Sequence, residues 1–432
     1  MFTILFLDFG LTISQFAILN AAWAATIVLL EVPSGAFADT LGRQKLLRTT
    51  GILMVFEIGI LCFAPRGNPD LLFVLFLINR IVSGTAEASA SGADEAIAYD
   101  SLKADGLAHE WGRVLEIQIR CQSAAYIGAM LIGAAVYDPV LMQKVVNTIG
   151  LDVVLTQDMT LRFPLYLTFC MALVTLVIVF RIKDVRPEGQ EECLPLAECG
   201  PSIREAFHLT FSAGKWILQT PFVLAIIMAG LLFDGVCRVV ITLSSQYYRV
   251  IDLPEASFGL IGSGIATLGL FLPRIARRMA ERNRPAANLF ALAGAVALGL
   301  VGMSFFIPRA GLIPAVILFS AMYFTSFFTS HYINRETESH QRATVLSFKG
   351  LAFNLSYGLL GILYSLLIFI YREGVSRDTP GLNPAAMENL VFMESFFWFP
   401  VSFGVLLILV VLLSRRMLRG RTEPAAPPPE TP

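Results

Sequence analysis

Charged side chains are scarce in this sequence. Asp, Glu, Lys and Arg make up 15% of its 432 residues, against about 25% in an ordinary soluble protein. This scarcity disfavours a secreted enzyme, a nucleic-acid-binding protein and a soluble nucleotide-binding fold. The formal net charge of −1 identifies no partner, so the distribution of charge along the chain is the more informative property.

Patterns of metal ligands and catalytic groups are lacking as well. The sequence has four His and six Cys, and the C-x5-C spacing of Cys193 and Cys199 is not a zinc pattern. It contains no H-E-x-x-H sequence and no Ser/His/Asp grouping. We therefore expect no metal site, no cofactor, no catalytic residue and no enzymatic activity.

Apolar residues, in contrast, are abundant. They make up 56% of the chain, and the mean hydropathy is +0.68. Twelve transmembrane helices of about 20 apolar residues each would use nearly all of them, which leaves little for a separate soluble domain. The runs are long and do not alternate, which favours helices over a membrane β-barrel. The composition therefore predicts an all-α membrane protein.

Long apolar runs separated by short polar loops predict eleven complete membrane spans. They cover residues 14–38, 46–64, 71–100, 114–136, 163–182, 221–247, 257–274, 286–306, 311–334, 344–371 and 390–414. Met1–Leu7 is apolar but too short to span a membrane, and it fits the end of a truncated first helix. We expect either a true start about 10–15 residues upstream or a defective chain.

The polar stretch 183–220 divides the chain into two halves. We predict an N-terminal bundle over 1–182, an inter-bundle loop over 183–220, a C-terminal bundle over 221–414 and a tail over 415–432. The end of this tail is rich in proline and is expected to be disordered. Within 138–162, we expect a short helix on the membrane surface, with an unstructured loop as the alternative.

The basic residues predict the orientation of the chain in the membrane. Of the 32 Lys and Arg residues, 21 lie in one set of alternate loops and 7 in the opposite set. Loops rich in Lys and Arg face the cytoplasm. We therefore expect a multi-pass protein of the cell (inner or plasma) membrane, with the 183–220 loop and the C-terminus in the cytoplasm.

One loop carries a distinct pattern, because residues 35–45 read GAFADTLGRQK, or G-x3-D-x2-G-R-x-K. Small residues at Gly35 and Gly42 permit a close helix approach and a tight turn. A carboxylate at Asp39 can face the positive end of a neighbouring helix. The guanidinium of Arg43 can hold another carboxylate through a forked contact, and Lys45 completes the pattern.

This loop resembles the signature loop of the major facilitator superfamily of transporters. On span 71–100, Arg80, Gly84 and Asp100 match residues that the family carries there. The resemblance implies two six-helix bundles that rock about a central site. It also implies that the loop ties its helix to the fourth and eleventh spans when the cavity opens outward. Gating residues would then be Gly35, Asp39, Gly42, Arg43, Lys45 and Asp100.

The second half of the sequence contains a faint echo of this loop. Gly269, Pro273 and Arg277 repeat the spacing of Gly35, Asp39 and Arg43 at an offset of 234 residues. Two related six-span halves are what the family resemblance implies.

Charged residues inside the spans are the candidates for substrate binding or proton coupling, because charge at mid-membrane costs at least ~2.5–3.5 kcal/mol. Arg80, Glu87 and Asp94 recur every seven residues and are expected to share one helix face. Asp234 and Arg238 form an i,i+4 pair. The alternative is that these groups merely neutralise one another.

The sequence thus predicts a secondary active transporter of a small solute that works by alternating access. Proton coupling through Glu87, or secondarily Asp234, and efflux rather than uptake are our leading hypotheses. A nutrient or metabolite uptake permease and a transport-inactive sensor or scaffold remain as alternatives. The expected partners are the solute, protons and the lipid bilayer, with no nucleic acid, and the functional unit is expected to be a monomer.

Overall fold

The computed structural model describes residues 11, 13–65, 68–137, 139–150, 154–182, 203–254, 257–378 and 383–418. Every regular element in these ranges is a helix. Eleven helical segments of the described chain are long and apolar enough to cross a membrane, and each coincides with one predicted span. The predicted all-α membrane fold is therefore confirmed. Met1–Leu7 and the proline-rich tail lie outside the described residues.

The contacts divide the chain into two compact units that do not follow sequence order. Unit 1 comprises Met1–Ala108, Gly128–Lys215 and Thr337–Leu351, and unit 2 comprises His109–Ile127, Trp216–Glu336 and Ala352–Pro432. Each unit therefore includes a short segment from the other half of the sequence. The predicted division at 183–220 stays a prediction.

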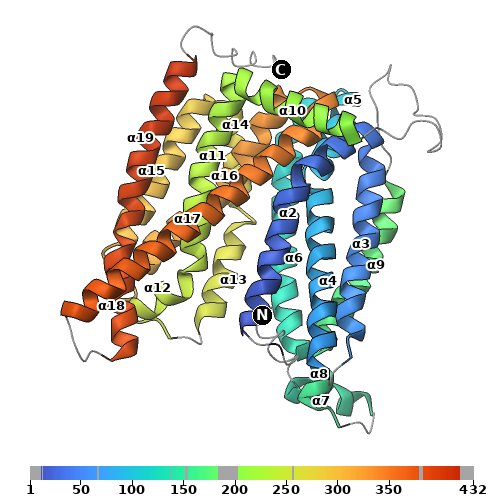
Figure 1. Cartoon of the computed structure of the whole chain (residues 1–432), viewed down its shortest axis with the longest axis vertical. Helices are drawn as coiled ribbons and strands as arrows, with labels where there is room; N and C mark the ends of the chain where they lie inside the picture. The colour runs from blue at the N-terminus through green and yellow to red at the C-terminus, as the bar shows by residue number, and fades with distance from the viewer. Residues whose placement is uncertain are drawn as a thin grey trace. The chain divides into compact units, whose positions relative to one another are not determined.

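Unit 1 is built around four long helices, with α2 packed on α3 and α4, and α3 packed on α9 (Figure 1). Its elements are α2 (Ile13–Leu41), α3 (Arg43–Phe63), α4 (Pro69–Ala90), α5 (Ala93–Ala104), the second part of α6 (Trp111–Tyr137), α7 (Pro139–Ile149), α8 (Gln157–Thr160), α9 (Phe163–Arg181), most of α10 (Ile203–Gln219), η3 (Ser339–Gln341) and the start of α17 (Arg342–Asp378).

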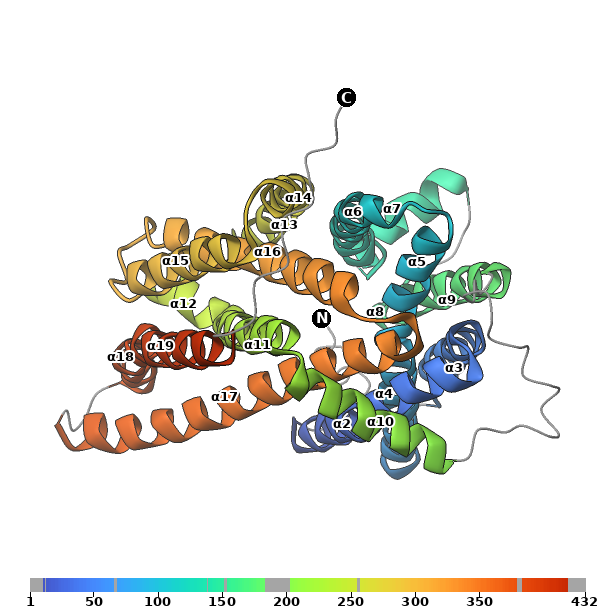
Figure 2. The same cartoon turned by 90° about the horizontal axis from the view of Figure 1, so that it is seen from above.

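Unit 2 surrounds α11, of whose 22 residues 14 are buried. Helix α11 contacts α16 and α19, and α15 packs on α16, as Figure 2 shows in end view. The elements are most of η1 (Ala108–Glu110), the first part of α6, α11 (Pro221–Thr242), α12 (Ser244–Val250), α13 (Phe258–Leu268), α14 (Leu272–Arg282), α15 (Pro285–Met303), α16 (Leu312–Glu336), the rest of α17, α18 (Pro384–Phe396) and α19 (Trp398–Leu418).

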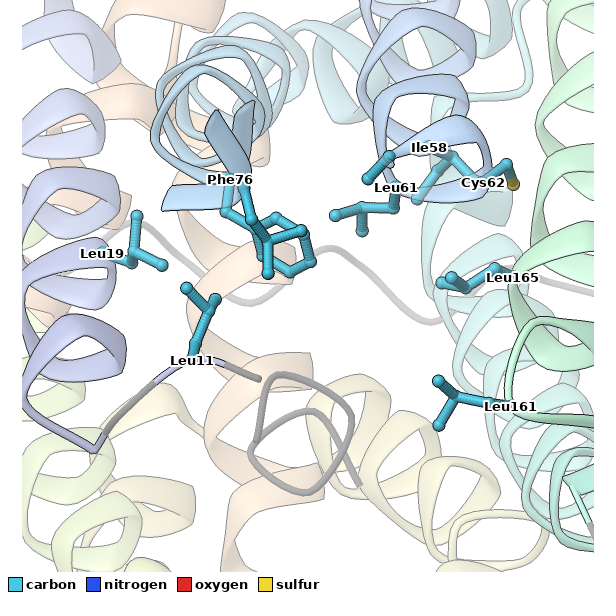
Figure 3. Packing of buried hydrophobic residues seen from close by; sticks show 10 residues of the cluster. Leu11, Leu19, Ile58, Leu61, Cys62, Phe76, Leu161 and Leu165 are labelled. Carbon is cyan, nitrogen blue, oxygen red and sulfur yellow. The ribbon is translucent and has the colours of Figure 1, made fainter. Parts of the chain in front are cut away.

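One end of unit 1 is held together by a buried apolar cluster (Figure 3). Leu19 of α2, Phe76 of α4 and Leu61 of α3 are each at most 1% exposed. Because lipid tails are as apolar as leucine, close packing rather than removal from water stabilises such contacts. Nearby, the Arg162 guanidinium donates to the carbonyls of Cys62 and Ala64 at 2.9 and 2.8 Å. These bonds provide partners for carbonyl groups at the C-terminal end of α3, which have none within the helix.

The structure differs from the sequence prediction at two places. Span 71–100 is not one helix, because α4 ends at Ala90 and α5 begins at Ala93, with Gly92 at φ 76° between them. The 183–220 stretch is not only a loop, because it contains α10. The apolar residues Ile203, Phe207 and Phe211 recur every four positions, and this spacing, which is typical of a helix, was overlooked in the sequence. The short helix expected within 138–162 is confirmed as α7.

Candidate functional site

Asp39 lies in the last turn of α2, and its carboxylate accepts hydrogen bonds at the N-terminus of α17. Its Oδ2 accepts from the backbone N–H and the hydroxyl of Thr344, both at 2.8 Å, and its Oδ1 accepts from the N–H of Ala343 at 3.3 Å. The first N–H groups of a helix lack partners within the helix and carry partial positive charge. Asp39 therefore stabilises the start of α17 from a different helix.

Arg43, the first residue of α3, extends this contact to α5. Arg43 as a whole is 7% exposed. The Nη2 atom donates to Asp39 Oδ1 at 3.0 Å and to the carbonyl of Ser339 at 2.5 Å, and Nη1 donates to the carboxylate of Asp100. One guanidinium thus joins the end of α2, the middle of α5 and the segment before α17, as its fixed fork of donors permits.

Asp100 lies between two arginines. Besides Arg43, it pairs with Arg342, the first residue of α17, and accepts from the Ser339 hydroxyl at 2.5 Å. The Arg342 guanidinium also lies 4.4 Å from the centre of the Tyr99 ring, a cation–π arrangement. We call this set the loop network; it consists of Asp39, Arg43, Asp100, Ser339, Arg342 and Thr344.

Three members of the loop network were not predicted as site residues. In the sequence, Arg342 was counted only among the basic residues of the loops. In the structure it is buried, with an exposed fraction of 1%. A signal for it exists, because a cation at the first position of a helix opposes the helix dipole and needs a carboxylate partner. Ser339 and Thr344 carry no comparable signal, since hydroxyl residues are ordinary at helix starts.

The glycines of the motif allow α2 to approach α17. A side chain at Gly35 would collide with that of Ser347 and lie 2.9 Å from the carbonyl of Ala343. Gly42 has φ 104° between α2 and α3, a conformation that glycine adopts without strain. Lys45 is exposed on α3.

A second set of polar contacts lies next to the loop network, between α2, the α4–α5 break and α17. Glu31 is 3% exposed, and its Oε1 accepts from the Ser91 hydroxyl at 3.0 Å. The Ser347 hydroxyl donates to the carbonyl of Ser91 at 2.9 Å, and Lys349 pairs with Glu95 at 3.1 Å. The sequence did not single out Glu31 as a site residue.

The predicted charge stripe is interrupted. Arg80 on α4 is 8% exposed and is attracted electrostatically by Glu57 of α3. Glu87 is exposed on the same helix. Asp94, expected on the same face, belongs to α5 because the chain breaks at Gly92. The expectation of a three-residue stripe is therefore wrong.

Gly84 of α4 gives close contact with α2, since a side chain there would lie 2.9 Å from the Trp23 carbonyl. In unit 2, Asp234 and Arg238 of α11 form an ion pair at 2.6 Å. Arg238 also donates to the Asn354 side chain at 2.9 Å and lies 5.5 Å from the centre of the Tyr357 ring.

The echo of the motif in the second half also bears an ion pair. Arg277 donates through Nε to Glu116 Oε2 at 2.7 Å, and Arg120 contacts the other oxygen of Glu116 at 3.3 Å. Glu116 is 5% exposed. Arg277 therefore has a buried carboxylate partner, as Arg43 has in the first half.

Within the described part of the chain, no cluster of three or more potential metal ligands occurs. The eleven helical segments of the described chain that are long and apolar enough to cross a membrane define a multi-pass membrane protein. The model of the Major Facilitator Superfamily matches residues 1–361, and the chain belongs to this family of transporters. A search among curated proteins gave no match.

Solved structures share the fold at low sequence identity. A bacterial homologue of the iron transporter ferroportin, in an outward-facing state, is 16% identical with a TM-score of 0.63, covering 96% of this chain and 93% of its own. The proton:xylose symporter XylE is 12% identical with a TM-score of 0.64, and the match covers 95% of this chain and 88% of the symporter. The fucose:proton symporter of Escherichia coli is 13% identical with a TM-score of 0.60, and the match covers 93% of each chain.

Proposed function

We propose that this protein is a secondary active transporter that moves a small solute by alternating access, coupled to protons, in the direction of efflux. The observation that carries the proposal is the loop network. Its contacts are polar and directional, they join the four helices α2, α3, α5 and α17, and they pair two carboxylates with two guanidiniums. Such contacts can be broken and remade as a unit, whereas interdigitated apolar packing changes less readily.

In this proposal the loop network is the gate. Asp39 holds the start of α17, and Arg43 and Arg342 hold α5 through Asp100. Opening would remove the Asp39 bonds to Thr344 and expose the two arginines to water, where their charges are solvated. The intact network favours a transporter over a transport-inactive sensor or scaffold.

Proton coupling is assigned to Glu87, with Asp234 as the second candidate. Glu87 is an exposed carboxylate on the helix that carries Arg80. Asp234 is 5% exposed and already bound to Arg238, so protonating it would cost an ion pair. This difference supports Glu87 as the group that exchanges protons.

The test is transport of ethidium, a cationic dye, into everted membrane vesicles under an imposed pH gradient. Glu87→Gln is expected to reduce the pH-driven component about tenfold or more, whereas Asp70→Asn, which removes an exposed carboxylate from the first turn of the same helix, is expected to retain it. Unchanged pH-driven transport in Glu87→Gln would show that another group carries the proton.

Uptake is the second candidate, because the fucose and xylose symporters of the same fold couple sugar to protons. A panel of radiolabelled sugars and metabolites in proteoliposomes, with and without a pH gradient, distinguishes the two directions. Asp39→Ala is the gating control and is expected to abolish flux in either case. Absence of flux for every solute, in the unmodified protein too, would favour the sensor. We propose a monomer as the functional unit.

A further inference from the structure

A groove on unit 2 is lined by none of the candidate site residues discussed above. It lies between α11, α15 and α19, which are neighbours in both Figures 1 and 2. Its volume is about 400 Å³. Of the described residues that line it, only Ser414 and Arg415 are polar, and Phe290 on its edge is 52% exposed.

The length of the groove matches one leaflet of a bilayer. Along α11 it runs from Phe222 to Phe233, and along α19 from Leu407 to Leu418. Eleven residues of helix rise about 16 Å, which is about half of the ~30 Å hydrocarbon core. An acyl chain of one leaflet therefore fits the groove from end to end.

One end of the groove is basic. Arg415 lines it there, and Arg284 directly precedes the lining residue Pro285 at the start of α15. Within the described residues, neither arginine forms an ion pair. The helix N-termini of α11 and α15 lie at the same end and add partial positive charge. No acidic residue lines the groove.

We propose that this groove is a specific site for an anionic phospholipid. One acyl chain would lie between α11, α15 and α19, and Arg415 would bind the phosphate, as basic pockets between membrane helices do. The proposal depends on the membrane placement of the chain and is independent of the transported solute.

The test is native mass spectrometry of the purified full chain with added dioleoylphosphatidylglycerol, compared with dioleoylphosphatidylethanolamine. The chains of these lipids are identical, so the comparison isolates the headgroup. We expect preferential retention of phosphatidylglycerol. Arg415→Gln is expected to weaken that binding about fivefold. Arg416→Gln removes the same charge one residue away, outside the groove, and is expected to leave binding unchanged.

A second pair of variants tests the acyl-chain site. Ala286 lines the groove and is exposed, whereas Ala287 is exposed but does not line it. Ala286→Trp is expected to abolish binding and Ala287→Trp to preserve it. Equal retention of the two lipids, or equal losses in Arg415→Gln and Arg416→Gln, would overturn the proposal, since either result describes nonspecific lipid contact. If the tryptophan variants misfold, the arginine pair decides alone.

Discussion

Asp100 faces the guanidinium groups of two buried residues, Arg43 and Arg342. Replacing it with asparagine would leave two buried cations against a neutral amide. Because removing one partner of a buried ion pair strands the other, we expect Asp100→Asn to lose about 3–5 kcal/mol of stability. Denaturation of the solubilised protein measures this loss.

The matched control is Asp105→Asn, at the exposed C-terminal end of the same helix, α5. It removes the same charge but no buried partner, so the expected change is within about 0.5 kcal/mol. Similar losses in the two variants would mean that the ion pairs of Asp100 contribute no net stability.

At the scale of elements, the break between α4 and α5 depends on Gly92. Its φ is 76°, and a side chain there would lie 2.7 Å from the Ala343 carbonyl and 3.0 Å from Leu346 Cβ. We expect Gly92→Ala to cost about 1–2 kcal/mol for the left-handed backbone and about 1–3 kcal/mol more for the displaced helix α17. Thermal unfolding measures the sum.

Gly106 separates these two effects. Its φ of 73° is nearly the same, but nothing lies within 4 Å of a side chain built there. Gly106→Ala should therefore show the backbone cost alone. If Gly92→Ala is no more destabilising than Gly106→Ala, then α17 does not need the close approach at Gly92.

At the scale of the whole molecule, the length of the apolar runs predicted the eleven spans, because each span must cover the membrane thickness. Ion pairs between residues far apart in the sequence were harder to predict. The motif marked Asp39 and Arg43, and its echo marked Arg277, but the contacts with Arg342 and Glu116 join segments far apart in sequence. The break at Gly92 was also missed, since its cause lies on α17 rather than in the local sequence.

The charge bias along the chain predicts which side of the membrane each loop faces, and two lysines of unit 1 test this directly. Lys103 on α5 and Lys144 on α7 are both exposed. The helices α5 and α7 lie at opposite ends of the unit (Figure 1). We introduce Lys103→Cys and Lys144→Cys separately into a variant whose native cysteines are replaced by alanine. Because basic loops face the cytoplasm, a membrane-impermeant thiol reagent should label position 144 in intact cells. It should label position 103 only after permeabilisation. The reverse pattern would invert the orientation and place the loop network at the outer surface, where it could not act as a cytoplasmic gate.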